Sequence, residues 1–141
     1  MTYKITLNSY DFSDKFLRLY AVACARAALA LIKNPDPRSI KAIDIAEAYA
    51  YGKATEAELA TAHKNAYAAA YAAATTADTA AYAAACAATA AYAHYAATAY
   101  YVATAYYAAK LNIDVDKILE NMIKDHYTEL ELLVLYKGDL P

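Results

Sequence analysis

The chain has 141 residues, and its 13 basic and 15 acidic side chains leave a formal net charge of −2. That balance gives no electrostatic footprint for a nucleic acid or for an anionic membrane. The low content of glycine and proline, together with 13% aromatic residues, also excludes a disordered chain. Length and composition therefore predict one helical domain over residues 1–141.

The first ten residues are ambiguous. Residues 3–7 alternate apolar and polar side chains like a short strand, but no partner strand is evident, so we expect residues 1–10 to form an N-terminal arm. Ser13 or Asp11 is a candidate N-cap for the helix that follows. Its apolar positions recur at a spacing of three and four: Phe16, Leu17, Leu19, Tyr20, Cys24, Leu31 and Ile32.

Two prolines within residues 34–37 end the first helix, and Asp36 at the N-cap with Pro37 at the first position starts the second. Gly52 is the expected C-cap of this second helix. Thr55 and Glu58 form a capping-box pattern that opens a third helix. The inward positions of the second helix are Ile40, Ile43, Ala46 (or Ile45) and Ala50, and the third carries Leu59, His63, Tyr67 and Tyr71.

Asp78 is the next candidate N-cap, and a helix from there to Lys110 would be nearly threefold longer than the mean, so we expect a break near His94. Asn112 and Asp114 precede a last amphipathic helix from Val115 to about Leu135, and residues 136–141 are a C-terminal tail. Its expected inward positions are Ile118, Leu119, Met122, Ile123, Tyr127, Leu130, Leu133 and Val134. The prediction is an all-α bundle of five or six helices with alanine- and tyrosine-rich central helices.

The alanine-rich run over residues 66–110 holds one large aliphatic residue, Val102, and many hydroxyl groups, which argues against a membrane span. Between Asp78 and Lys110 only His94 can carry a charge, so this segment is buried by its own chain or by a partner. Phased at about 100° per residue, six tyrosines share one side: Tyr82, Tyr92, Tyr95, Tyr100, Tyr106 and Tyr107. That side is either core with hydroxyls at the rim or a partner-binding surface.

No set of side chains with matched catalytic roles is evident. The three histidines lack a metal-binding spacing, and Asp44 and Glu47, with lysines nearby, are expected on a solvated face. Cys24 and Cys86 are expected to be buried thiols of a reduced cytoplasmic chain, since the first residues lack the pattern of a signal peptide. The alternative is a disulfide between their two helices. We therefore expect no enzymatic activity, no metal and no cofactor.

Several local patterns occur in a fixed order: the residues 17–25 with Cys24, the turn Asp36-Pro37-Arg38, the segment 48–53 ending around Gly52, and the alanine run broken at Asp78. Over roughly residues 15–130 this order resembles a family of small bacterial immunity proteins from polymorphic toxin systems. The resemblance implies structural roles for these residues and no catalytic ones. The family often has tryptophan where this chain has Tyr20 and Tyr49 or Tyr51, and more arginine in the alanine segment.

The resemblance implies a non-enzymatic immunity or inhibitor protein, bacterial or phage-encoded, that neutralises a toxin or effector protein. Its tyrosine face would then occlude the active site of that partner. The alternative is a helical self-assembling or ligand-binding protein, in which the tyrosines line a homo-oligomer interface or an internal pocket.

Overall fold

The computed structural model describes residues 2–72 and 97–138, the side chains of 97–103 excepted, and this part of the chain contains helices and no strand. The helices are α1 (Tyr3–Ser9), α2 (Asp14–Leu29), α3 (Pro37–Ala50), α4 (Glu56–Ala72), α6 (Ala97–Lys110), α7 (Val115–His126) and α8 (Glu129–Leu135). The all-α class is thus confirmed, whereas the expected count of five or six is too low, since the described residues alone form seven helices. The predicted cap Asp78 and the predicted break near His94 lie outside the described residues.

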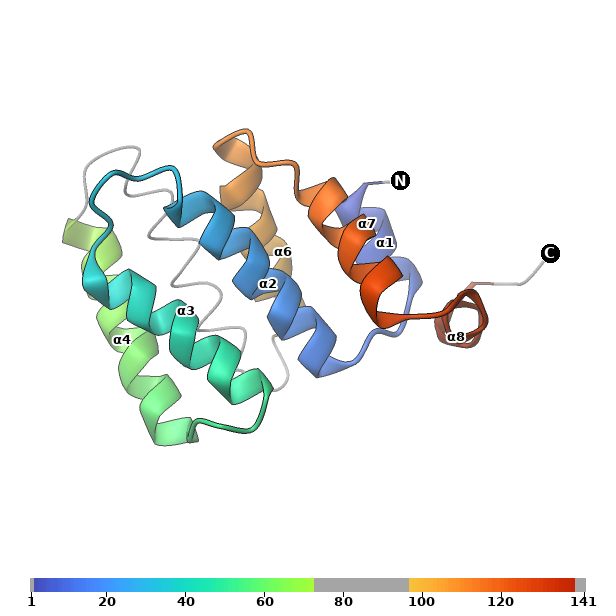
Figure 1. Ribbon diagram of the computed structural model, residues 1–141, viewed down its shortest axis with the longest axis horizontal. Helices are drawn as coiled ribbons and strands as arrows, with labels where there is room; N and C mark the ends of the chain where they lie inside the picture. The colour runs from blue at the N-terminus through green and yellow to red at the C-terminus, as the bar shows by residue number, and fades with distance from the viewer. Residues whose placement is uncertain (1, 73–96, 139–141) are drawn as a thin grey trace.

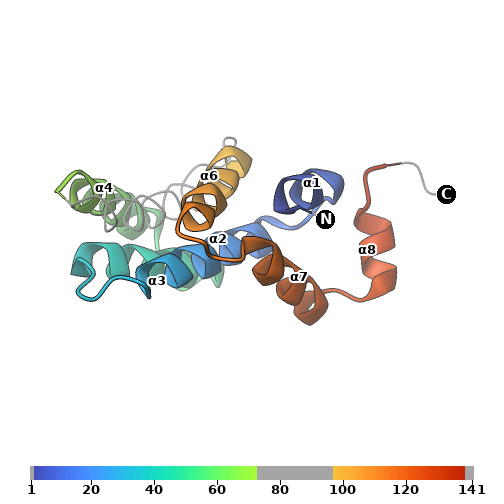
Figure 2. The same cartoon turned by 90° about the horizontal axis from the view of Figure 1, so that it is seen from above.

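Helix α2 occupies the middle of the bundle, where it packs against α3, α6 and α7. Helix α4 packs on α3, and α1 packs on α7 (Figure 1). Figure 2 shows the same order from above, with α4 at one end of the molecule and α8 at the other. Helix α8 follows α7 directly in the chain, and a bridge between Tyr10, just after α1, and Tyr136 attaches its other end.

Local side-chain chemistry sets the helix ends. The Ser13 hydroxyl accepts a hydrogen bond from the backbone N–H of Phe16, and Asp36 caps α3 in the same way. Gly52 (φ +73°) and Asn112 (φ +63°) adopt the left-handed conformation just after α3 and α6. Glycine and asparagine are the residues that tolerate this conformation best, which is why the chain turns at these two points.

The N-terminal residues form helix α1 instead of the expected extended arm. Tyr3, Thr6 and Leu7 are buried, at the spacing of one helix face, and the Tyr3 backbone N–H donates to the Asp116 carboxylate at 2.6 Å. This contact with the first turn of α7 holds the segment against α7, where a helix buries more of its apolar side chains than an extended arm would.

The first predicted helix was too long, because α2 ends at Leu29. Leu31 lies beyond that end and is 56% exposed, and Ile40, also expected to face inward, is 41% exposed. Ser39, one position earlier on α3, is fully buried in its place. Ile43 and Ala46 are buried as predicted, so the buried face of α3 differs from the predicted one at its first turn, where Ser39 replaces Ile40.

The last predicted helix, Val115 to about Leu135, is two helices. Helix α7 ends at His126, Tyr127 is extended (φ −134°, ψ 140°), and Thr128 caps α8. The restart changes the direction and rotation of the chain, so Leu130, Leu133 and Val134, expected to face inward, are exposed.

The core is centred on α2, where Phe16, Tyr20 and Cys24 are buried. The Tyr20 hydroxyl donates to the backbone oxygen of Val115 at 3.0 Å, which fixes the start of α7 against α2. Small side chains let neighbouring helices approach closely. Between α3 and α4 these are Ala42, Ala62 and Ala66, and on α6 they are Ala105 and Ala108.

Candidate functional site

Helix α8 is short and is anchored at both ends. Thr128 and Glu131 form a capping box: the Thr128 hydroxyl accepts from the Glu131 N–H, and the Glu131 carboxylate accepts from the Thr128 N–H. After the helix, Tyr136 pairs with Tyr10 in an antiparallel bridge. Two backbone hydrogen bonds make this bridge, from Asp11 to Leu135 at 2.8 Å and from Lys137 to Ser9 at 2.9 Å.

The outer face of α8 is an apolar stripe, formed by Leu130, Leu133 and Val134. These side chains are 72%, 55% and 78% exposed, respectively. The opposite face carries Leu132 and Leu135, which are half-buried against the core, and no residue of α8 is buried. A helix that is apolar on both faces normally has both of them covered, so the apolar stripe is a candidate binding surface.

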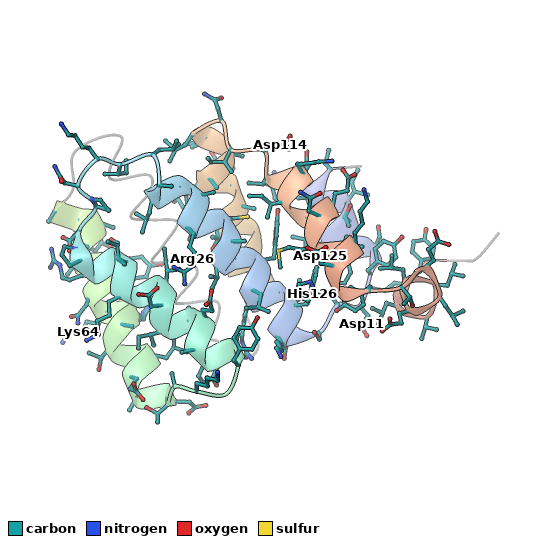
Figure 3. All side chains as sticks on the ribbon, viewed as in Figure 1. Asp11, Arg26, Lys64, Asp114, Asp125 and His126 are labelled. Atoms are coloured by element: carbon teal, nitrogen blue, oxygen red, sulfur yellow. The ribbon has the colours of Figure 1, made fainter. Side chains whose placement is uncertain are left out.

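Carboxylates lie around the apolar stripe. Glu129 and Glu131 are on α8 itself, and both are exposed. The hydrogen bond from the Thr128 backbone lowers the pKa of Glu131, so this side chain is ionised at neutral pH. Figure 3 shows Asp11 and Asp125 at the same end of the molecule, and both are also exposed. The apolar stripe therefore lies on an acidic part of the protein surface.

A cavity of about 360 Å³ lies on the inner side of α8. Its apolar lining includes Tyr10, Leu119, Ile123 and Leu132. At its edge, hydrogen bonding to Lys124 and the charge of Lys117 lower the pKa of Glu120. The two lysines thus offset the charge of Glu120, and the Asp116 carboxylate, which also lines the cavity, accepts from the Tyr3 backbone N–H. The cavity therefore offers mainly apolar contacts to a ligand.

A second cavity, of about 370 Å³, lies between α3 and α4. Arg38 and Lys41 lie on one side, and Glu58, Thr61 and Asn65 lie on the other. Arg38 is held by a bidentate contact with Asp36, and Glu58 is held by the Thr55 cap. The Arg38 and Glu58 side chains are therefore already engaged in contacts within the chain.

The predicted tyrosine face is only partly within the described residues. Tyr106 on α6 is 45% exposed, with the Lys110 ammonium 5.0 Å from its ring centre, whereas its neighbour Tyr107 is half-buried and packs against the core. The two rings meet at 5.6 Å in an edge-on contact. The side chain of Tyr100 and the residues Tyr82, Tyr92 and Tyr95 lie outside the described part.

The cysteine and histidine side chains of the described residues are Cys24, His63 and His126. Burial raises the pKa of the Cys24 thiol to about 12, so it is protonated at neutral pH and is a poor nucleophile. Burial lowers the pKa of His63, whose ring meets Tyr67 edge-on. A ring nitrogen of His126 lies 2.8 Å from the backbone oxygen of Met122. Cys86 and His94 lie outside the described residues.

Asp44 and Glu47 lie on the surface of α3, where Arg26 of α2 contacts both carboxylates at 3.0 and 3.1 Å. This pairing joins two helices, and it could not be predicted from local spacing because Arg26 lies on another helix. Over residues 2–72 and 97–138, no group of three metal-ligating side chains converges, and no helix has the length and apolar character needed to cross a membrane.

The apolar stripe is the surface that sequence reasoning misses, because the spacing of its residues predicts core positions. A signal was present: Thr128 and Glu131 have the capping-box spacing, which marks a new helix start after Tyr127. Comparisons with known protein families, with curated proteins and with solved structures gave no match.

Proposed function

We propose that the chain is a non-enzymatic immunity or inhibitor protein that binds and neutralises a toxin or effector protein. The observation that supports this most is the apolar stripe on α8, where three adjacent aliphatic side chains are more than half exposed. Clustered exposed aliphatic side chains are typical of protein-binding surfaces.

The shape of the stripe favours a protein partner over a small molecule. Sites for small molecules are concave and enclose most of the ligand. Helix α8 instead stands at the end of the molecule (Figures 1 and 2) and contributes no buried residue to the bundle. A protruding helix is best covered by a groove on another protein, which is a common mode of recognition.

The family resemblance supports the same proposal through Cys24, the Asp36-Pro37-Arg38 turn and Gly52. An inhibitor acts by occupying the surface that its target needs, so it requires a stable bundle and an exposed contact face. The buried, protonated thiol of Cys24 is in keeping with a structural role for that residue.

Co-expression tests this proposal. The chain is produced together with the product of the adjacent gene, and growth and co-purification by size-exclusion chromatography are measured. We expect growth arrest by that product to be relieved and a stable complex to be recovered, whereas an unrelated toxin should stay active. Absence of both rescue and complex for every neighbouring gene would refute the proposal.

Light scattering of the chain alone tests the alternative, a self-assembling protein. A stable oligomer formed without any partner would favour that alternative, and a monomer would favour the inhibitor.

A further inference from the structure

The apolar stripe has a negatively charged border on both of its long sides. At about 100° per residue, Leu130, Leu133 and Val134 share one side of α8, and Glu129 and Glu131 fall on opposite edges of it. Both glutamates are exposed. A protein that covers the stripe must therefore also meet these two carboxylates.

Two further carboxylates reach this end of the molecule from other segments. Asp125 lies in the last turn of α7, and Asp11 is linked to α8 by its backbone hydrogen bond to Leu135 (Figure 3). Among the described residues, Lys124 is paired with Glu120 at 3.2 Å, and Lys137 follows the helix. Within this described part of the chain, carboxylates from three segments thus outnumber the unpaired lysines near the stripe.

We infer that the apolar stripe binds an apolar groove bordered by lysine and arginine side chains on the partner protein. This inference rests on the proposed function and names the chemistry of the partner's surface. Aliphatic side chains would supply the buried contact, and the carboxylates would attract and orient the basic border.

The same charges disfavour two other occupants. In a symmetric dimer the stripe would face its own copy, and the carboxylates of the two chains would be brought together. At a bacterial membrane surface, the carboxylates would be repelled by anionic headgroups, to which membrane-binding helices present lysine and arginine. Charge complementarity therefore favours a basic protein.

The test measures the affinity of the complex between this chain and the neighbouring gene product, for wild type and two double variants. L130S/V134S removes the apolar contact, and D125K/E129K reverses the border charge. We expect L130S/V134S to weaken binding at least about tenfold. D125K/E129K should weaken it about three- to tenfold at about 50 mM salt, with the difference disappearing near about 0.5 M.

Matched controls are available elsewhere on the chain. Leu31, 56% exposed, serves as the control for exposed aliphatic positions. Glu56 directly follows the capping Thr55 in α4, as Glu129 follows Thr128 in α8. We expect L31S and E56K to bind within about twofold of wild type. Because α8 has no buried residue, both double variants should keep the melting temperature of the bundle, which circular dichroism checks.

The possible results distinguish a failure of this inference from a failure of the proposed function. A complex whose affinity is unchanged in both double variants would overturn the inference and leave the proposed function standing. Failure to form a complex with any neighbouring product would overturn both. Self-association that is lost in L130S/V134S, or binding to phosphatidylglycerol vesicles, would assign the stripe to a second copy or to a membrane and would also overturn the inference.

Discussion

Replacing Tyr20 by phenylalanine removes a single oxygen atom from the centre of the bundle. The side chain is fully buried, and its hydroxyl donates to the backbone oxygen of Val115 at 3.0 Å. Burial first, and then the contact with Cys24, raises the pKa of this phenol well above its usual range. The Y20F variant therefore loses this hydrogen bond between α2 and the start of α7.

The expected loss of stability depends on which polar groups keep a hydrogen-bond partner in the Y20F variant. Val115 is the first residue of α7, so its carbonyl oxygen also accepts the helical hydrogen bond from Leu119 and keeps one partner. We therefore expect a loss of about 1–2 kcal/mol in the free energy of unfolding, at the lower end for buried groups. For a chain of this length that corresponds to a fall of about 3–8 °C in Tm.

Thermal and urea unfolding followed by circular dichroism measure this effect. Tyr51 is half exposed and stacks under Lys15 through its ring, so Y51F is a control that should stay within about 0.5 kcal/mol of wild type. A Y20F protein as stable as Y51F would show that the hydroxyl does not hold α7 against α2. A loss above about 4 kcal/mol would mean that the core rearranges.

Three further predictions test other parts of the structure. G52A should lose about 1 kcal/mol, because nothing crowds the added Cβ but alanine disfavours a φ of +73°, and G52N should recover part of it. L119A should lose about 3 kcal/mol in urea unfolding, because Leu119 is 2% exposed, whereas L133A on the outer face should lose little. The free energy of unfolding of the wild type should fall as pH rises from about 9 toward about 12, because the Cys24 thiol is then still protonated in the folded protein but ionised in the unfolded chain. In C24A this fall should be shallower, by up to about 1.4 kcal/mol per pH unit.

A G52A protein that melts at the wild-type temperature would contradict the prediction for Gly52, and an L119A protein as stable as L133A would contradict the prediction for Leu119. Parallel profiles of stability against pH for wild type and C24A would contradict the prediction for the thiol.

The helix ends could be predicted from the sequence because they depend on neighbouring residues. Ser13, Asp36 and Thr55 cap the helices that follow them, and Gly52 ends α3. Each of these features is decided within a few residues of chain, where the preference for caps and left-handed turns outweighs tertiary effects.

Helix α1 and the outer face of α8 could not be predicted in the same way. Residues 3–7 alternate like a strand, and their helical form depends on α7, which lies at the other end of the chain. The apolar positions at 130, 133 and 134 continue the spacing of α7, so the pattern alone places them in the core. Only the restart at Thr128 turns them outward. Of the predicted tyrosine face, Tyr106 is exposed and Tyr107 packs against the core, since adjacent residues on a helix diverge by about 100°.

The bridge between residues 9–11 and 135–137 also bears on how the protein folds. It joins segments from opposite ends of the described chain, and such contacts form slowly because a long loop must close before they are made. Helices α2, α3 and α4 are neighbours in sequence and can assemble first. We therefore expect α8 to dock last, and the surface proposed for binding to be presented only by a chain that has finished folding.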